Sequence, residues 1–186
     1  MLAKLFEVKD AGDKGKGLFA KEPIPKGTIV SFECQQCIRI SRDDFELILT
    51  NKEKSLILRY GYRKADGSYL LPCDEIIYLN HSCSANIPDS GKGFDIVVKD
   101  IARGEEATYD YRFFFFFFFQ NSDEFECMCG EDNCFKIVRS VYDQHNPQRC
   151  EVLEFWKKRV EAALICIDKI DKQPLKDKLP HIESFK

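Results

Sequence analysis

The sequence predicts a mainly β fold with short helices and one longer helix near the C-terminus. Short runs rich in β-branched and aromatic residues recur between residues 5 and 111, and glycine or proline turns separate them. Only the stretch from Leu153 to Ile170 repeats apolar residues at three- and four-residue steps. The length of 186 residues suits one domain, or one domain with a short helical appendage, and the hydrophobic content of 44% is enough for a packed core.

The first strands are joined by glycine turns. Residues 5–9 form a predicted strand, three glycines between residues 12 and 17 supply the turn, and residues 18–20 resume a strand. A turn rich in proline and glycine then leads into a strand over residues 28–32. The closely spaced glycines are typical of an ordinary hairpin, but also of a loop whose backbone approaches a ligand.

The middle of the chain predicts a helix followed by a hairpin. Residues 34–37 form a CxxC in a strand-like stretch, where the two thiols face opposite sides, which favours packing over metal binding. Residues 41–44 resemble a capping box and open a helix over residues 45–49. Residues 60–62 and 66–71 read as two strands joined at an Asp-Gly turn.

A polar cluster follows a predicted buried strand. The strand is residues 76–79, and the cluster, residues 80–86, contains two amides, an imidazole, two hydroxyls and a thiol. This is a common place for a functional site, although Asn and Ser also form simple polar turns. Residues 94–99 predict another strand, and the segment from Gly104 to Tyr111 turns at its glycine before a β-forming run.

The cysteines predict a metal site. Cys127, Cys129 and Cys134 lie within eight residues, and a closed structural zinc site needs a fourth ligand. Cys83 is the favoured fourth ligand, and it would hold the cysteine-rich segment beside the polar cluster. Cys34 or Cys37 is the alternative. Nine cysteines, an odd number, favour reduced thiols and metal over a disulfide framework.

The C-terminal third changes character. Residues 113–119 are consecutive phenylalanines, an aggregation hazard if exposed, so we expect a neighbouring segment or a partner to bury them. Asn146-Pro147 starts a predicted amphipathic helix of about 20 residues. Packing against the domain is its simpler role, and a homodimer or partner surface is the alternative. Residues 168–186 predict a loosely ordered tail.

The charge balance argues against direct nucleic-acid binding. The net charge of −3 and the pI near 5.7 give no overall positive field, so a basic protein tail is the more natural partner. The N-terminus lacks the apolar run of a signal peptide, and no stretch of about 18 apolar residues could cross a membrane. We therefore expect a soluble intracellular protein, cytoplasmic or nuclear.

Four motifs, in the correct order, resemble those of the SET-domain lysine methyltransferases with a cysteine-rich post-SET segment. They are Lys14-Gly15-Lys16-Gly17-Leu18-Phe19-Ala20, Asn80-His81-Ser82-Cys83, Gly104 to Tyr111, and Cys127-x-Cys129-x4-Cys134. The resemblance covers residues 5–138. The sequence departs from the family pattern at Ile77, Ala85, Ala107 and Phe135-Lys136.

The resemblance implies a SET-like fold of the β-clip type, with the chain near Tyr111 tucked under a loop in a pseudoknot. It divides the chain into a SET domain over residues 1–112, a post-SET zinc segment over residues 113–138, and a C-terminal helix and tail over residues 139–186.

The resemblance also implies an enzyme that transfers methyl groups from S-adenosylmethionine to lysine side chains of a protein substrate, such as a histone-like tail. Tyr111 is the implied catalytic residue. The implied cofactor-binding residues are Lys16, Gly17, Leu18, Asn80, His81 and Phe135. The implied substrate-binding residues are Tyr60, Tyr62 and Tyr109, although tyrosines in strands are also common core residues. The implied ligands of a structural zinc ion are Cys83, Cys127, Cys129 and Cys134. The alternative function is a catalytically silent SET-like module that binds zinc and other proteins.

Overall fold

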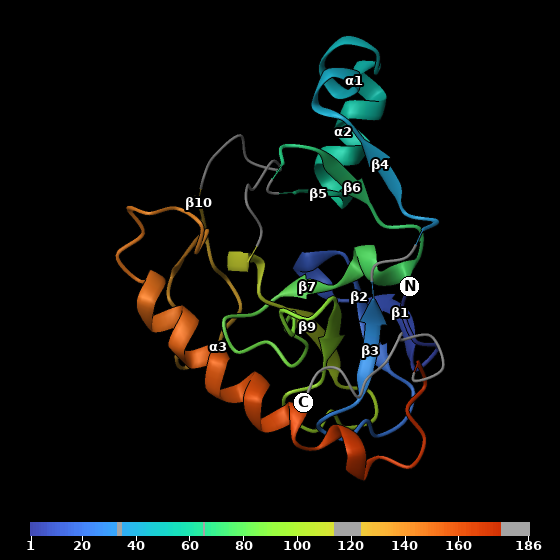
Figure 1. Ribbon diagram of the computed structural model, residues 1–186, viewed down its shortest axis with the longest axis vertical. Coiled ribbons are helices and arrows are strands. Elements are labelled where there is room, and N and C mark those ends of the chain that lie inside the picture. Colours follow the sequence, from blue (N-terminus) through green and yellow to red (C-terminus); the bar gives the residue numbers. More distant parts are fainter. Residues whose placement is uncertain (33–34, 65, 114–123, 176–186) are drawn as a thin grey trace.

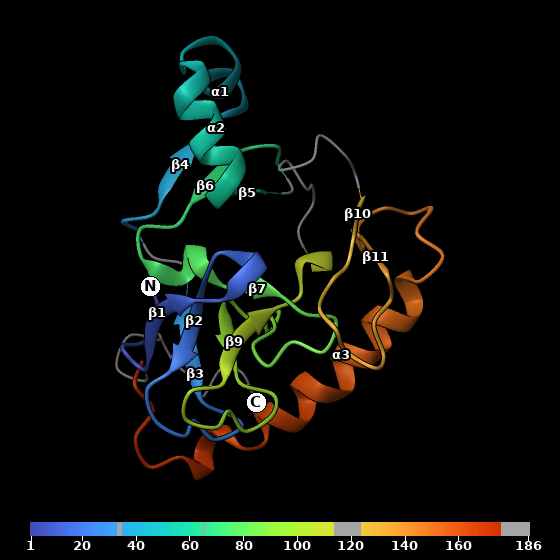
Figure 2. The same cartoon turned by 180° about the vertical axis from the view of Figure 1, so that it is seen from behind.

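The computed structural model describes residues 1–32, 35–64, 66–113 and 124–175. Within these ranges the strands form small separate sheets in one body, with helices around them (Figures 1 and 2). The predicted mainly β fold with short helices is therefore confirmed. Most of the phenylalanine run, Cys34 and the end of the predicted tail lie outside the described residues.

A four-stranded sheet forms the centre of the molecule, in the order β1-β2-β9-β7. Its strands are β1 (Phe6–Asp10), β2 (Lys16–Ala20), β9 (Glu106–Tyr109) and β7 (Asn80–His81). β1 and β2 form the predicted hairpin around a short 3-10 helix, η1 (Gly12–Lys14), and β9 pairs antiparallel with β2. β7 runs parallel to β9, which brings two segments that are distant in sequence into contact.

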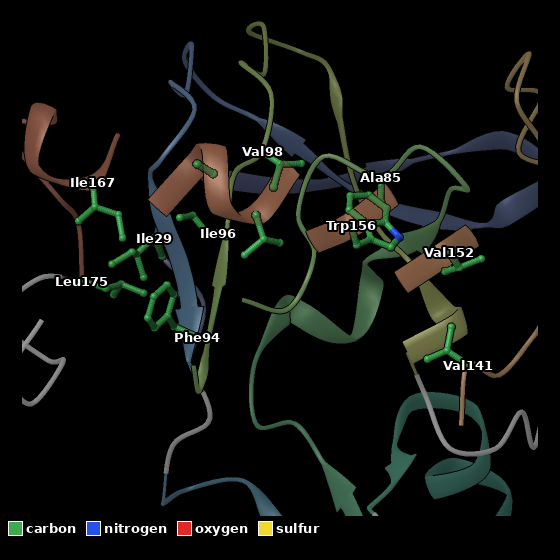
Figure 3. Close-up of a cluster of buried hydrophobic side chains, with 13 residues drawn as sticks. Ile29, Ala85, Phe94, Ile96, Val98, Val141, Val152, Trp156, Ile167 and Leu175 are labelled. Carbon is green, nitrogen blue, oxygen red and sulfur yellow. The ribbon is translucent and has the colours of Figure 1, made fainter. Parts of the chain in front are cut away.

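A second sheet is covered by the C-terminal helix. β3 (Ile29–Phe32) pairs antiparallel with β8 (Phe94–Ile96), and α3 (Arg149–Leu164) packs its apolar side against them (Figure 3). The buried residues of α3 are Val152, Trp156, Val160 and Ala163. The 3-10 helix η5 (Ile167–Lys169) follows and adds Ile167 to the same cluster. The periodic apolar residues thus form a face that packs within the chain's own core.

Two helices and three strands project from the main body (top of Figure 1). They are β4 (Ile38–Ile40), α1 (Arg42–Leu47), α2 (Asn51–Tyr60), β5 (Tyr62–Arg63) and β6 (Tyr69–Leu71), and the strand order is β4-β6-β5. As predicted, Ser41 caps α1, since its hydroxyl accepts the Asp44 N–H at 3.0 Å. The predicted turn at Gly67 also joins β5 to β6, with a φ of 86°.

The cysteine-rich segment forms a hairpin beside the central sheet. β10 (Glu124–Glu126) pairs antiparallel with β11 (Ile137–Arg139), and the cysteines lie in the connection between them. The short 3-10 helix η3 (Tyr111–Phe113) directly follows the strand β9 and its connecting residue Asp110. Among the described residues, no helix is long and apolar enough to span a membrane.

Three local predictions from the sequence are wrong. Residues 76–79 do not form a strand, because the Asp74 carboxylate accepts the Ile76 N–H and starts the 3-10 helix η2 (Glu75–Tyr78). Tyr60 does not open a strand either, because it ends α2, a helix that starts at an unpredicted capping box between Thr50 and Glu53. Cys37 follows a turn rather than lying in a strand.

The start of the C-terminal helix also differs slightly from the prediction. α3 begins at Arg149, after the predicted Asn146-Pro147 start. The Asn146 side chain still organises the approach to the helix, since its Oδ1 accepts the Gln148 N–H at 2.9 Å. Its Nδ2 donates to the Ser140 carbonyl oxygen at 3.0 Å. Asn146 therefore stabilises the turn before the helix instead of capping its first residue.

Candidate active site

The parallel pairing of β7 with β9 creates the candidate site. Asn80 lies opposite Thr108 and His81 opposite Tyr109, so the polar cluster and the strand leading to Tyr111 lie side by side (Figures 1 and 2). The Tyr111 backbone N–H donates to His81 Nδ1 at 3.1 Å. The Tyr111 hydroxyl donates to the Leu79 carbonyl oxygen at 2.6 Å. Tyr111 is therefore fixed at both its backbone and its hydroxyl by the segment around Asn80.

The environment of Tyr111 keeps its phenol neutral. Burial raises the pKa of Tyr111 well above its usual range, and the Glu106 carboxylate adds to that effect. The rings of His81 and Phe125 surround it, with centroids 5.4 Å and 6.4 Å from the Tyr111 ring. A neutral phenol is both a donor and an acceptor, so it can orient an amine without carrying charge.

The glycine-rich motif from Lys14 to Ala20, called the glycine loop below, lies against Asn80. Asn80 Nδ2 donates to the Lys16 carbonyl oxygen at 3.1 Å and to Glu106 Oε1 at 2.8 Å. A Cβ atom on Gly17 would come within 2.8 Å of Glu106 Oε1 and 3.1 Å of Asn80 Nδ2, so any side chain here would displace these two polar groups. The Leu18 side chain is fully buried, which leaves its backbone for any ligand.

Glu106 is a site residue that the sequence reasoning did not single out. Its Oε2 accepts from Lys14 Nζ at 2.6 Å, while its Oε1 accepts from Asn80. It therefore links the glycine loop to the polar cluster through one carboxylate. The sequence did carry a signal for Glu106. Alternation along β9 predicts that Glu106 faces the same side of the strand as Thr108, the residue that lies opposite Asn80.

The predicted zinc ligands come together. The sulfur atoms of Cys83, Cys127, Cys129 and Cys134 all lie within 4.8 Å of one another. A tetrahedral Zn²⁺ with bonds of about 2.3 Å separates its sulfur ligands by about 3.8 Å. The distance of 3.6 Å between the sulfur atoms of Cys83 and Cys127 fits this geometry. The donor set is that of a closed structural zinc site, and Cys37 lies instead with its sulfur 3.9 Å from that of Cys73.

His81 connects the cysteine cluster to Tyr111. Because its Nδ1 accepts the Tyr111 N–H, its ring proton is assigned to Nε2, which lies 3.5 Å from Cys83 Sγ. Hydrogen bonds from Cys127 and then from His81 lower the pKa of Cys83, although burial opposes them. The hydrogen bond between Cys83 and Cys127 also raises the pKa of Cys127, so the two thiols share one proton, which metal binding would have to displace. The His81 side chain is only 7% exposed.

The segment between the cysteines also contacts the polar cluster. Ser82 Oγ donates to Glu131 Oε1 at 3.0 Å. Phe135, which follows Cys134, lies against the Arg112 guanidinium. The central carbon of the guanidinium is 4.2 Å from the centroid of the Phe135 ring. Phe125 of β10 faces His81, with ring centroids 5.9 Å apart. Phe125 and Arg112 are neighbours of the site that the motifs did not indicate.

The three tyrosines expected at the substrate side lie in different environments. Tyr60, at the end of α2, has its ring 6.2 Å from that of Tyr78. Tyr62 begins β5 opposite Leu70. Tyr109 lies opposite His81 in the β7–β9 pair, and burial raises its pKa, an effect to which the Asp95 and Asp89 carboxylates add.

Histone-lysine methyltransferases are among the relatives of the chain. It is 31% identical over 138 residues to "Histone-lysine N-methyltransferase, H3 lysine-4 specific" of Schizosaccharomyces pombe, covering 63% of this chain and 13% of that protein. It is 28% identical over 169 residues to "Histone-lysine N-methyltransferase ATX2" of Arabidopsis thaliana, covering 78% of this chain and 14% of that protein. It is 27% identical over 143 residues to human "Histone-lysine N-methyltransferase 2B", covering 67% and 5%. The chain thus spans less than a sixth of the length of these curated relatives.

Among solved structures, the chain is similar to the methyltransferase domain of human histone-lysine N-methyltransferase SETMAR, with a TM-score of 0.48 and 22% identity, covering 73% of this chain and 58% of that chain. The family model of the SET domain matches residues 15–112, more than half of the chain and the part that contains the glycine loop, the polar cluster and β9. The chain therefore belongs to the SET domain family.

Proposed function

We propose that this protein transfers methyl groups from S-adenosylmethionine to the side-chain amine of lysine in a protein substrate. The observation that carries this proposal is the position of Tyr111, a neutral, half-buried phenol held by His81 and Leu79. Next to it lies Asn80, which contacts the glycine loop and would be displaced by a side chain at Gly17.

The glycine loop and the polar cluster are the proposed cofactor site. When bound, S-adenosylmethionine supplies an electrophilic methyl group on a positively charged sulfonium. Lys16, Gly17 and Leu18 would contribute backbone groups, and Asn80 an amide that is already aligned with them. The buried ring of His81 supports a backbone role for that residue. Phe135, beside the cysteine cluster, would cover the site from the zinc segment.

The site must present lysine as an uncharged amine. Free lysine has a pKa of about 10.4, roughly three units above neutrality, so burial or a nearby positive charge has to favour the neutral form. Tyr111 can then accept a hydrogen bond from the amine and align its lone pair. Methyl transfer is an in-line displacement, so alignment and exclusion of water are the main contributions of the chain.

The substrate is proposed to be a histone-like basic protein. The names of the relatives support this class, and the net charge of −3 supports a basic partner rather than nucleic acid. Tyr109 is the best-supported wall of the lysine channel, because it lies opposite His81 in the β7–β9 pair, and Tyr62 would contribute from β5. Tyr60 would contribute from the end of α2. A histone substrate would place the protein in the nucleus.

The four cysteines are proposed to bind a structural zinc ion that orders the wall beside Tyr111. The connection between β10 and β11 has few apolar residues, so metal binding would supply the free energy that orders it. Zinc would take no part in methyl transfer.

The proposal is tested by incubating the protein with methyl-labelled S-adenosylmethionine and a mixed protein lysate, then identifying labelled bands by mass spectrometry. Label on lysine of a basic protein is the expected result. A protein that binds zinc and cofactor but transfers no label would instead be the catalytically silent module.

A further inference from the structure

The helix α3 lies outside the part of the chain that matches the SET family, yet it reaches the candidate site. Trp156, on its buried face, is 2% exposed (Figure 3). Its indole Nε1 donates to Asp110 Oδ2 at 2.5 Å. Asp110 directly precedes Tyr111, so the helix contacts the residue next to the proposed catalytic tyrosine.

Asp110 is paired with Arg112 in the protein interior. Arg112 Nε donates to Asp110 Oδ1 at 2.9 Å, and Nη2 donates to Oδ2 at 2.6 Å. The side chains of Asp110 and Arg112 are 0% and 1% exposed. Asp110 Oδ1 also lies 3.9 Å from His81 Nδ1, the atom that accepts the Tyr111 N–H. The two charged residues, Asp110 and Arg112, therefore flank Tyr111 along the chain.

Arg112 extends this network to the cysteine cluster. Its Nη2 donates to the Cys83 carbonyl oxygen at 3.0 Å, and its guanidinium stacks on Phe135, the residue after Cys134. One side chain thus holds the backbone of one proposed zinc ligand and the neighbour of another. Within the described residues, its Nη1 is buried and has no hydrogen-bond partner.

A buried ion pair of this kind is weak evidence for stability. Removing two charges from water costs free energy, and well-packed apolar residues often replace such a pair without loss of stability. An unsatisfied buried donor adds to that cost. The planar Arg112 guanidinium donates its hydrogen bonds in fixed directions. It therefore fixes the relative positions of the Asp110 carboxylate, the Cys83 carbonyl and the Phe135 ring.

We propose that Arg112 is the positioning residue that sets the geometry of the four-cysteine site, and that Trp156 of α3 keeps Arg112 in place through Asp110. The C-terminal helix is then a working part of the site and more than a cover for the core. The inference rests on the zinc ion of the proposed function, because it concerns how tightly the four thiolates hold that ion.

The test compares the rate at which zinc leaves the folded chain of 186 residues to a chromogenic chelator. Arg112→Lys keeps the charge but loses the planar fork, and Trp156→Phe keeps an aromatic ring but loses the N–H donor. Val160→Ala is the matched control, because Val160 is buried on the same face of α3 and truncating its side chain loosens packing but removes none of the hydrogen bonds of the network. The free energy of unfolding is measured for all three variants.

We expect zinc release about tenfold faster in Arg112→Lys and about threefold faster in Trp156→Phe, as for other residues that orient metal ligands. Val160→Ala should release zinc at nearly the wild-type rate, even where it is destabilised as much as Trp156→Phe. If Arg112→Lys does not fold, Trp156→Phe still decides the question. The inference is overturned if the release rates follow only the loss of stability, or if Trp156→Phe releases zinc at the wild-type rate. Wild-type protein without zinc would contradict the proposed metal site itself, which is a separate result.

Discussion

A Cβ atom added at Gly17 would meet Glu106 Oε1 at 2.8 Å, Ala11 Cβ at 3.0 Å and Asn80 Nδ2 at 3.1 Å. The two polar atoms end flexible side chains and can move aside, and a shift of a few tenths of an ångström relieves the contact with Ala11, so a methyl group at Gly17 would disturb these neighbours rather than unfold β2. Gly17→Ala should therefore keep nearly the wild-type free energy of unfolding and weaken S-adenosylmethionine binding by about tenfold, the effect of one lost hydrogen bond. Isothermal titration calorimetry measures this. Unchanged affinity would remove the glycine loop from the proposed cofactor site.

Tyr111 should affect methyl transfer and not the fold. Tyr111→Phe removes the hydroxyl that donates to the Leu79 carbonyl oxygen and that would orient the amine. We expect kcat to fall about a hundredfold, as for a misaligned reactant, with cofactor affinity preserved. Tyr142→Phe is the control, because Tyr142 is also a tyrosine but is exposed and is none of the residues assigned to the proposed site. Full activity in Tyr111→Phe would refute its catalytic assignment.

Asp95 should make stability depend on pH. Burial raises its pKa to about 7, although a hydrogen bond from the Ser31 hydroxyl opposes this. An unfolded Asp has a pKa of about 3.9, so between pH ~4 and ~7 the folded state binds the extra proton and stability falls as pH rises. Asp95→Asn removes this titration. As the pH rises across that range, the free energy of unfolding of the variant should therefore increase relative to that of the wild type, as measured by urea denaturation. Parallel curves for the two proteins would contradict the assignment.

At the scale of elements, the sequence predicted those with local signals. Ser41 caps α1 and Gly67 turns the β5–β6 hairpin because these residues act on their own neighbours. The Ile76–Leu79 segment failed as a strand, because apolar periodicity over four residues cannot separate a buried strand from a 3-10 helix started by Asp74. Tyr60 failed for a similar reason, since the Thr50 capping box was overlooked.

The α2 cap gives a prediction at the same scale. Thr50 Oγ1 accepts the Glu53 N–H, and Glu53 Oε2 accepts the Thr50 N–H. Thr50→Ala should destabilise α2 by about 1 kcal/mol and speed amide exchange in its first turns. Ser55→Ala is the control, because the Ser55 hydroxyl only donates to the Asn51 carbonyl oxygen of its own helix. Equal exchange in both variants would show that the cap contributes little.

At the scale of the whole molecule, the candidate site depends on contacts between distant segments. The motifs indicated Asn80, Tyr111 and the four cysteines, and the family explains why these residues meet. The links through Trp156, Arg112 and Glu106 join residues up to 92 positions apart and carry no local signal. Only the folded chain reveals that the C-terminal helix reaches the residue beside Tyr111.

Metal removal should disrupt the candidate site without unfolding the domain. The four cysteines belong to a small hydrophobic cluster of their own, while the largest hydrophobic cluster is formed mainly by β3, β8 and α3. Chelation should therefore abolish cofactor binding and activity before the helical circular dichroism signal is lost. Cys83→Ser should mimic chelation, whereas Cys150→Ser, at an exposed position on α3, should retain zinc and activity. Tight zinc in Cys83→Ser would exclude it as the fourth ligand.

The central claim is that the arrangement around Tyr111 methylates lysine in a basic protein. The most direct measurement is peptide mass spectrometry of purified histones after incubation with S-adenosylmethionine that carries a deuterated methyl group, using wild-type protein and Tyr111→Phe in parallel. The account predicts deuterated methyl groups on lysine side chains with the wild type, and almost none with Tyr111→Phe. Label on residues other than lysine, or equal label with both proteins, would contradict it.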